Sequence, residues 1–203
     1  MTVLLNPLKN GPTVLVTGVG AAEGARGAAA ALACAEADVD RARLLIDVGG
    51  KAPRPTLIAS AAARQLEERI RAHLPDARVA ARGQVCHLAV AAEPEGLDLA
   101  SAAATVARET GAVVHLPPEL LHAVLAAPSW RPSGVLLRAD LGDDRALVAL
   151  AVRDLIGRGL PAVVLKRRLA WVVERRALFG VLPPGAPGGL PERLVRRLAV
   201  AGR

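Results

Sequence analysis

The sequence predicts an α/β fold: a three-layer, doubly wound and mostly parallel sheet with helices on both faces. Short runs of apolar residues alternate along the 203-residue chain with longer stretches of helical pattern, and this alternation is typical of βαβ units. Within the runs the apolar residues are consecutive, which indicates strands buried on both faces. The helical stretches are also long enough for the crossovers that parallel strands require.

The predicted strands are bounded by glycine, proline or charged residues. In chain order they are residues 12–17, 43–47, 84–90, 112–116, 134–138 and 162–165, with a short edge strand at 180–182. The central strands are expected at residues 14–16, 44–46, 113–115, 135–137 and 163–165, because apolar residues fill consecutive positions there.

The predicted helices lie between these strands. They cover residues 24–36, 56–74, 97–109, 119–127, 143–158 and 169–177. Thr56, behind Pro55, is the expected N-cap of the second helix, and Asp143 or Asp144 that of the fifth.

Composition excludes some classes of function. The net charge is +7, but 23 of the 26 basic residues are Arg and 42 positions are Ala, which indicates genome base composition more than selection for a basic surface. The chain contains only three Phe, Trp or Tyr residues, which are Trp130, Trp171 and Phe179. Because single-stranded nucleic acids are held by stacking on aromatic rings, we expect no specific nucleic-acid partner.

The chain shows no signal of secretion, membrane insertion or metal binding. No apolar run reaches the roughly 18 residues of a spanning helix, and the N-terminus lacks the pattern of a signal peptide, so a cytoplasmic protein is expected. Cys34 and Cys86 are too few for a metal site or a disulfide framework. Strand alternation aims Cys86 and His87 at opposite faces, so these two and His115 are interpreted as core or strand-end residues.

The first strand-to-helix turn is rich in glycine, with Gly18, Gly20, Gly24 and Gly27 in residues 17–27. In a doubly wound sheet this turn is the usual phosphate site. Against a phosphate, Glu23 places a carboxylate in the loop, and Arg26 stands near the position of a P-loop lysine, which is absent. The alternative is that the glycines make a tight turn and let the first helix pack close to the sheet.

A dinucleotide site is a competing interpretation of the same turn. The spacing of Gly18, Gly20 and Gly24 approximates the Rossmann fingerprint, and Asp47 follows Gly24 by 23 residues, where a ribose-binding acid would fall. NAD(P) and ATP are therefore kept as alternative cofactors, although no cofactor is expected.

The order of the motifs resembles the MinD/ParA group of deviant P-loop ATPases, nearest to its pilus-assembly and septum-site branch of CpaE/TadZ type. The likeness covers residues 13–184. Its segments are residues 14–33 for the strand, P-loop and first helix, 44–47 (LLID), 113–118 (VVHLPP), 163–167 (VVLKR) and 180–183 (GVLP). The resemblance implies a P-loop fold, a homodimer and a role in placing an assembly machine.

The chain departs from the family where the nucleotide would bind. His115 stands at the position of the metal-side Asp, Lys166 at that of the adenine-reading Asn, and the P-loop lysine is missing. Only Asp47 on the switch side and the prolines persist; Leu182 and Pro183 stand, like Lys166, at former adenine-side positions. We therefore expect a pseudo-ATPase in which Glu23 or Arg26 occupies the old phosphate loop, with Arg26 pairing with Asp47.

The last part of the chain is expected to lie outside the main domain. Residues 1–182 form the α/β domain, residues 183–189 (PPGAPGG) a linker, and residues 190–199 a short basic amphipathic helix within the 183–203 tail. MinD-type proteins end in such a helix, so the resemblance implies weak contact with the inner face of a membrane. Packing of this helix on the sheet or at a dimer interface is the alternative.

Overall fold

A computed structural model describes residues 13–19, 22–38, 40–53, 58–130, 132–139, 145–160, 162–166 and 178–181. Its strands are β1 Thr13–Gly18, β2 Arg43–Val48, β3 Arg78–Arg82, β4 Val85–Val90, β5 Ala112–His115, β6 Gly134–Ala139, β7 Ala162–Lys166 and β8 Leu178–Val181. Its helices are α1 Ala22–Glu36, α2 Ala61–His73, α3 Pro94–Val106, α4 Leu121–Ala126 and α5 Arg145–Gly157, with a 3₁₀ turn, η1, at Pro118–Leu120.

The strands form one sheet in the order β3-β4-β2-β5-β1-β6-β7-β8. Every neighbouring pair is parallel except β3 and β4, which are antiparallel. The five expected central strands all lie within the parallel part of the sheet. The predicted fold class, a mostly parallel sheet flanked by helices, is therefore confirmed.

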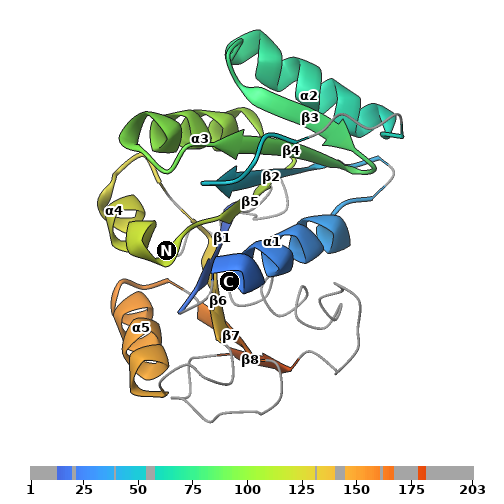
Figure 1. Ribbon diagram of the computed structural model, residues 1–203. Helices are drawn as coiled ribbons and strands as arrows, with labels where there is room; N and C mark the ends of the chain where they lie inside the picture. The colour runs from blue at the N-terminus through green and yellow to red at the C-terminus, as the bar shows by residue number, and fades with distance from the viewer. Residues whose placement is uncertain are drawn as a thin grey trace, which may run out of the picture.

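Helices cover both faces of the sheet, as Figure 1 shows with α1 on one side and α3, α4 and α5 on the other. The core between α1 and the sheet contains Val16 and Leu136 of the strands and Leu32 of α1. The core on the opposite face contains Leu15 and Ile46 of the strands together with residues of α2, α3, α4 and α5, such as Leu66 of α2. Adjacent strand residues thus divide between two cores, which explains why the strand sequences are apolar throughout.

The edge strand β3 was not predicted. Its sequence RVAAR has one β-branched residue and three buried positions between two exposed arginines, so the short run gives little strand signal. It forms because it pairs with β4 and packs under α2.

Several predicted helix bounds are wrong. Helix α2 begins at Ala61, and its N-cap is Ser60, whose side chain accepts a hydrogen bond from the Ala63 amide, so Thr56 is not the cap. Helix α3 begins three residues earlier than expected, with Pro94 at its first position, where a missing N–H is harmless. The expected helix over 119–127 is divided into η1 and α4.

Other expectations lie outside the described residues. They include the helix over 169–177, the caps Asp143 and Asp144, the linker 183–189 and the helix over 190–199. The strand predicted at residues 180–182 corresponds to β8, which begins two residues before the predicted position.

Candidate functional site

The carboxyl ends of β1 and β5 meet at the point where the connections of the sheet change direction. These strands are neighbours, but the chain leaves β1 toward β2 and leaves β5 toward β6, on the other side of β1. In open α/β sheets, ligands bind in the crevice at such a switch point. Gly18 ends β1 and His115 ends β5 there, so the sequence-predicted turn lies at this edge.

Asp47 is the buried carboxylate at this edge of the sheet. It lies one residue before the end of β2, opposite His115 of β5 in the parallel register, and is 5% exposed. Its Oδ1 atom lies 2.8 Å from His115 Nδ1 and accepts a hydrogen bond from Arg26 Nε at 3.0 Å. We call Asp47, His115 and Arg26 the Asp47 cluster.

Helix α1 supplies the cation of the Asp47 cluster. Arg26 reaches from the first part of α1 to β2, and its Nη2 also donates to the carbonyl oxygen of Gly49 at 3.4 Å. The Arg26 side chain keeps 41% of its surface exposed, whereas that of Asp47 keeps 7%. The ion pair predicted from the sequence is confirmed.

The contacts of the cluster favour the ionised form of Asp47. Burial raises the pKa of Asp47, but hydrogen bonds from His115 and Arg26 and the charge of Arg26 outweigh it, so the pKa lies below its ordinary value. Because the carboxylate is ionised at neutral pH, His115 Nδ1 carries the proton that it donates. His115 is fully buried, and its Nε2 atom has no hydrogen-bond partner among the described residues.

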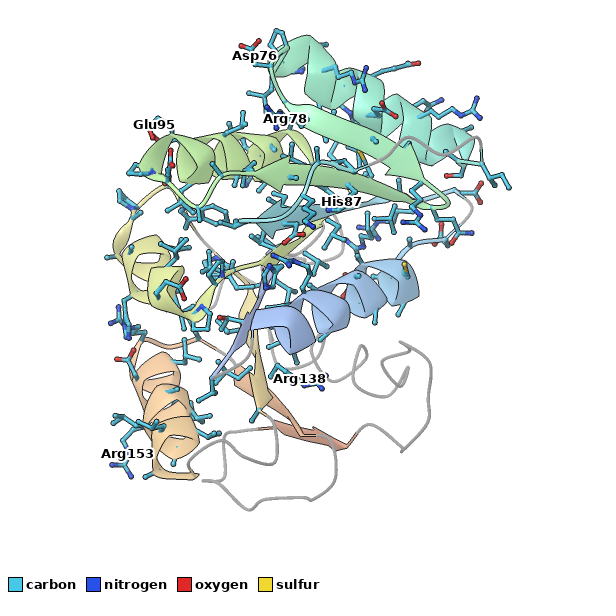
Figure 2. All side chains as sticks on the ribbon, viewed as in Figure 1. Asp76, Arg78, His87, Glu95, Arg138 and Arg153 are labelled. Atoms are coloured by element: carbon cyan, nitrogen blue, oxygen red, sulfur yellow. The ribbon has the colours of Figure 1, made fainter. Side chains whose placement is uncertain are left out.

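A second imidazole lies close to the cluster. Figure 2 labels His87 on β4, whose Nε2 atom lies 4.0 Å from Asp47 Oδ2. Burial lowers the pKa of His87; Asp47 opposes this effect, while Arg82 and Arg26 add to it. The ring is therefore mainly neutral at pH 7, and the 4.0 Å separation is longer than a hydrogen bond.

A glycine turn after β2 makes room for the Asp47 carboxylate. Gly49 adopts φ +72°, which L side chains disfavour. A Cβ atom added to Gly50 would lie 2.1 Å from Asp47 Oδ2, so a larger residue would displace the carboxylate. Sequence reasoning missed both residues, although a Gly-Gly pair directly after a predicted strand is a usable signal.

The glycine-rich segment is helical over most of its length. Helix α1 begins at Ala22, so Gly24 and Gly27 lie in its first turns and not in the expected loop. A Cβ atom at Gly27 would meet nothing within 4 Å, so close packing on the sheet does not explain this glycine. The alternative interpretation of the glycines is therefore wrong at Gly27.

The other predicted site positions are only partly described. Glu23 lies in α1 and Lys166 is the last residue of β7, but their side chains lie outside the description, as do Gly20, Leu182 and Pro183. The structure therefore brings together Arg26, Asp47 and His115, of which the contact with His115 was not predicted.

Cys86 and His87 point to opposite faces of the sheet, as strand alternation predicted. Cys86 is packed in the core beneath α2, and burial raises the pKa of its thiol to about 12, so it is not a nucleophile at neutral pH. Among the described residues, no three His, Cys, Asp or Glu side chains are placed to hold a metal ion.

The arrangement can neutralise a carboxylate and orient an imidazole. Both bonds to Asp47 end on the same oxygen, Oδ1, and both donors belong to this chain.

A scan against protein-family models and a search of the curated proteins gave no match. In the part of the chain that the structure describes, no helix has the length and apolar character needed to cross a membrane.

Proposed function

We propose that this chain is a non-catalytic scaffold of the MinD/ParA kind, a pseudo-ATPase that positions or recruits a cell-envelope or pilus assembly machine. The observation that carries the proposal is the state of Asp47. The acid that persists at the nucleotide edge is 5% exposed and bonded to Arg26 and His115 of the same chain. This supports the proposal because the acid that would serve a bound nucleotide already has its partners within the chain.

The chemistry of His115 supports the same conclusion. The resemblance assigns its position to the metal-side Asp, and magnesium requires hard anionic oxygens there. An imidazole that is fully buried and donates to Asp47 supplies no such oxygen. Charge on a transferring phosphoryl group then lacks the electrostatic compensation that carries most of this catalysis.

The NAD(P) alternative draws less support from the cluster. A ribose-binding acid has to accept hydrogen bonds from the hydroxyl groups of the ribose. Asp47 is the residue at the expected spacing, but Oδ1 already has two partners and the residue is 5% exposed. A nucleotide- or NAD(P)-dependent enzyme with an atypical loop remains the alternative that the experiment below separates.

The partners of the scaffold are proposed from the resemblance. We expect protein partners, a homodimer, and weak contact of residues 190–199 with the inner face of a membrane. These residues lie outside the described part of the chain, so the support for this contact comes from their sequence.

Thermal melting of the full chain with ATP·Mg, ADP, NAD and NADP tests the proposal. A ligand present at one hundred times its dissociation constant adds about 2.7 kcal/mol to stability and shifts the melting temperature visibly. The expected result is no shift with any of the four, together with no magnesium-dependent release of phosphate from ATP. A saturable shift with one of them would support the enzyme alternative.

A second experiment tests whether nucleotide binding at the glycine-rich loop of residues 17–27 can be restored. The double variant Glu23→Gly, Arg26→Lys removes the anion from the loop and places a lysine near it. A shift with ATP·Mg in this variant and none in the parent is the result expected of a retired phosphate loop. The single variant Glu23→Gln, which keeps Arg26 in place, is the matched control.

A further inference from the structure

Among the strands that the structure describes, β3 stands at the end of the sheet and pairs with β4 alone. In its antiparallel register with β4, successive residues alternate between pointing their main-chain groups at β4 and pointing them outward. An outward row of N–H and C=O groups is a template on which another chain can add a strand.

Two side chains of α2 form hydrogen bonds with outward-pointing main-chain groups of β3. The Ala81 amide donates to Glu67 Oε2 at 2.8 Å, and Arg71 Nη2 donates to the Val79 carbonyl oxygen at 2.9 Å. Glu67 and Arg71, four residues apart on the helix, are joined at 2.7 Å. We call Glu67 and Arg71 the edge clip.

The segment before α2 occupies the far end of the same row. The Gly83 amide donates to the Ile58 carbonyl at 2.9 Å, and the Ser60 amide donates to the Gly83 carbonyl at 2.7 Å. Ala59 and Gly83 form a parallel bridge. Residues 79, 81 and 83 share one side of the edge, and each has main-chain groups bonded within this chain.

We propose that the edge clip closes β3 against strand addition by a second copy of this chain. The strand itself provides little protection, because its buried centre, Val79, Ala80 and Ala81, contains no proline and no charge. Its charged residues, Arg78 (labelled in Figure 2) and Arg82, stand at the two ends. The edge is therefore protected by side chains of α2 and by the segment before it, and we expect any dimer of the scaffold to use another surface.

The double variant Glu67→Ala, Arg71→Ala tests this inference in the full chain without a change of net charge. We expect hydrogen exchange of the Ala81 amide to accelerate about fivefold, because a lost hydrogen bond is worth about 1 kcal/mol. We also expect a concentration-dependent increase in molar mass over the parent, measured by light scattering after size exclusion. Ala81 should then regain protection at high protein concentration, where strands pair.

Two controls separate the clip from a general loss of stability. Arg69→Ala, Glu109→Ala removes another ion pair of α2, at 3.3 Å, and should leave the molar mass and the Ala81 exchange unchanged. Glu67→Gln keeps an acceptor for the Ala81 amide and should keep its protection. If the double variant does not fold, Glu67→Ala alone frees the Ala81 amide and is measured in the same way.

Equal molar mass and equal Ala81 exchange in parent and clip variant would overturn the proposal. Faster exchange without any added association, up to the highest concentration measured, would overturn it as well, since the edge would then be open and still unused. Neither result depends on nucleotide binding, so the inference is tested independently of the pseudo-ATPase proposal.

Discussion

Helix α1 and strand β2 are joined by an ion pair at each end of the strand, and the two pairs have opposite polarity. At the carboxyl end, the helix supplies Arg26 and the strand supplies Asp47. At the amino end, the helix supplies Glu36 and the strand supplies Arg43, with Arg43 Nε 3.4 Å from Glu36 Oε2 and both side chains 8% exposed. We call Arg43 and Glu36 the amino-end pair.

Both helix residues carry the charge that the helix dipole disfavours. Arg26 lies near the N-terminus of α1 and Glu36 is its last residue, whereas a cation is stabilised at the C-terminus and an anion at the N-terminus. The contacts with β2 therefore hold these residues against the local electrostatics of the helix. This suggests that α1 is fixed on the sheet by its partners at both ends.

The two pairs differ in how their carboxylates are bonded. Asp47 is bonded to both His115 and Arg26, and its pKa is lowered in spite of burial. For Glu36, burial raises the pKa, and the charges of Arg43 and Arg41 only partly oppose it. Charge-assisted hydrogen bonds at good distance thus decide whether a buried carboxylate is stabilised as an anion.

The largest effect is expected from Arg43→Met. It leaves Glu36 buried without its cation and removes the hydrogen bond from Arg43 to the carbonyl oxygen of Thr110, so the free energy of unfolding should fall by about 3 kcal/mol. Urea denaturation measures the change. The double variant Arg43→Met, Glu36→Leu should recover most of the loss, because an apolar pair of similar volume replaces the ions. No recovery would show that the pair has a role besides charge compensation.

A smaller effect is expected from Asp47→Ala at the carboxyl end. The fully buried His115 Nδ1 loses its acceptor, whereas Arg26 can turn to water, so the loss should be about 2 kcal/mol. Asp47→Asn keeps an acceptor oxygen and should lose less. Equal stability of all three proteins would mean that the cluster contributes nothing to the fold.

The sequence predicts the ion pair of Arg26 with Asp47 but not the added contact with His115, and it does not predict the amino-end pair. Arg26 and Asp47 were expected to meet because both lie at the carboxyl edge of adjoining βα elements. His115 was not expected to bond Asp47, because the contact spans 68 residues and depends on β5 lying between β2 and β1. Strand order arises from tertiary packing, and nothing in the local pattern of either strand specifies it.

The difference between local sequence signals and tertiary packing also explains which strands were predicted. Consecutive apolar residues identify the parallel strands because burial on both faces leaves a local signal. The strand β3 has no such signal, since its pairing with β4 and its contacts with Glu67 and Arg71 come from elsewhere in the chain.

The contributions of Asp47 and Glu36, at the two ends of β2, to the free energy of unfolding should depend on pH in opposite directions. The stabilisation from Asp47, whose pKa is lowered from 3.8, is present above that value and is lost as pH falls through the folded pKa. The contribution of Glu36, whose pKa is raised from 4.5, is most favourable below that value and is lost as pH rises through the folded pKa.

Urea titrations of the parent, Asp47→Asn and Glu36→Gln between about pH 3 and pH 7 test these signs. The difference between the parent and Asp47→Asn should shrink toward acid pH. The difference between the parent and Glu36→Gln should move in favour of the parent toward acid pH. Parallel curves for the two variants would contradict the contrast between the ends.

The smallest effect on stability is expected from Arg26→Ala. The Arg26 side chain is 41% exposed, and partly exposed ion pairs contribute about 1 kcal/mol or less, while Asp47 keeps its bond to His115. Thermal melting should therefore show only a small decrease in the melting temperature, in contrast to Arg43→Met at the other end of β2.

The Arg26→Ala variant also tests the proposed function, because it removes the cation of the Asp47 cluster from the switch point and leaves the carboxylate in place. If the cluster is a substitute for ligand, Arg26→Ala should still show no shift with ATP·Mg, since this variant keeps the Glu23 carboxylate and, unlike Glu23→Gly, Arg26→Lys, places no lysine near the loop. A shift with ATP·Mg in Arg26→Ala alone would mean that Arg26 blocks a working nucleotide site, and the protein would then be an inhibited ATPase and not a scaffold that has lost its chemistry.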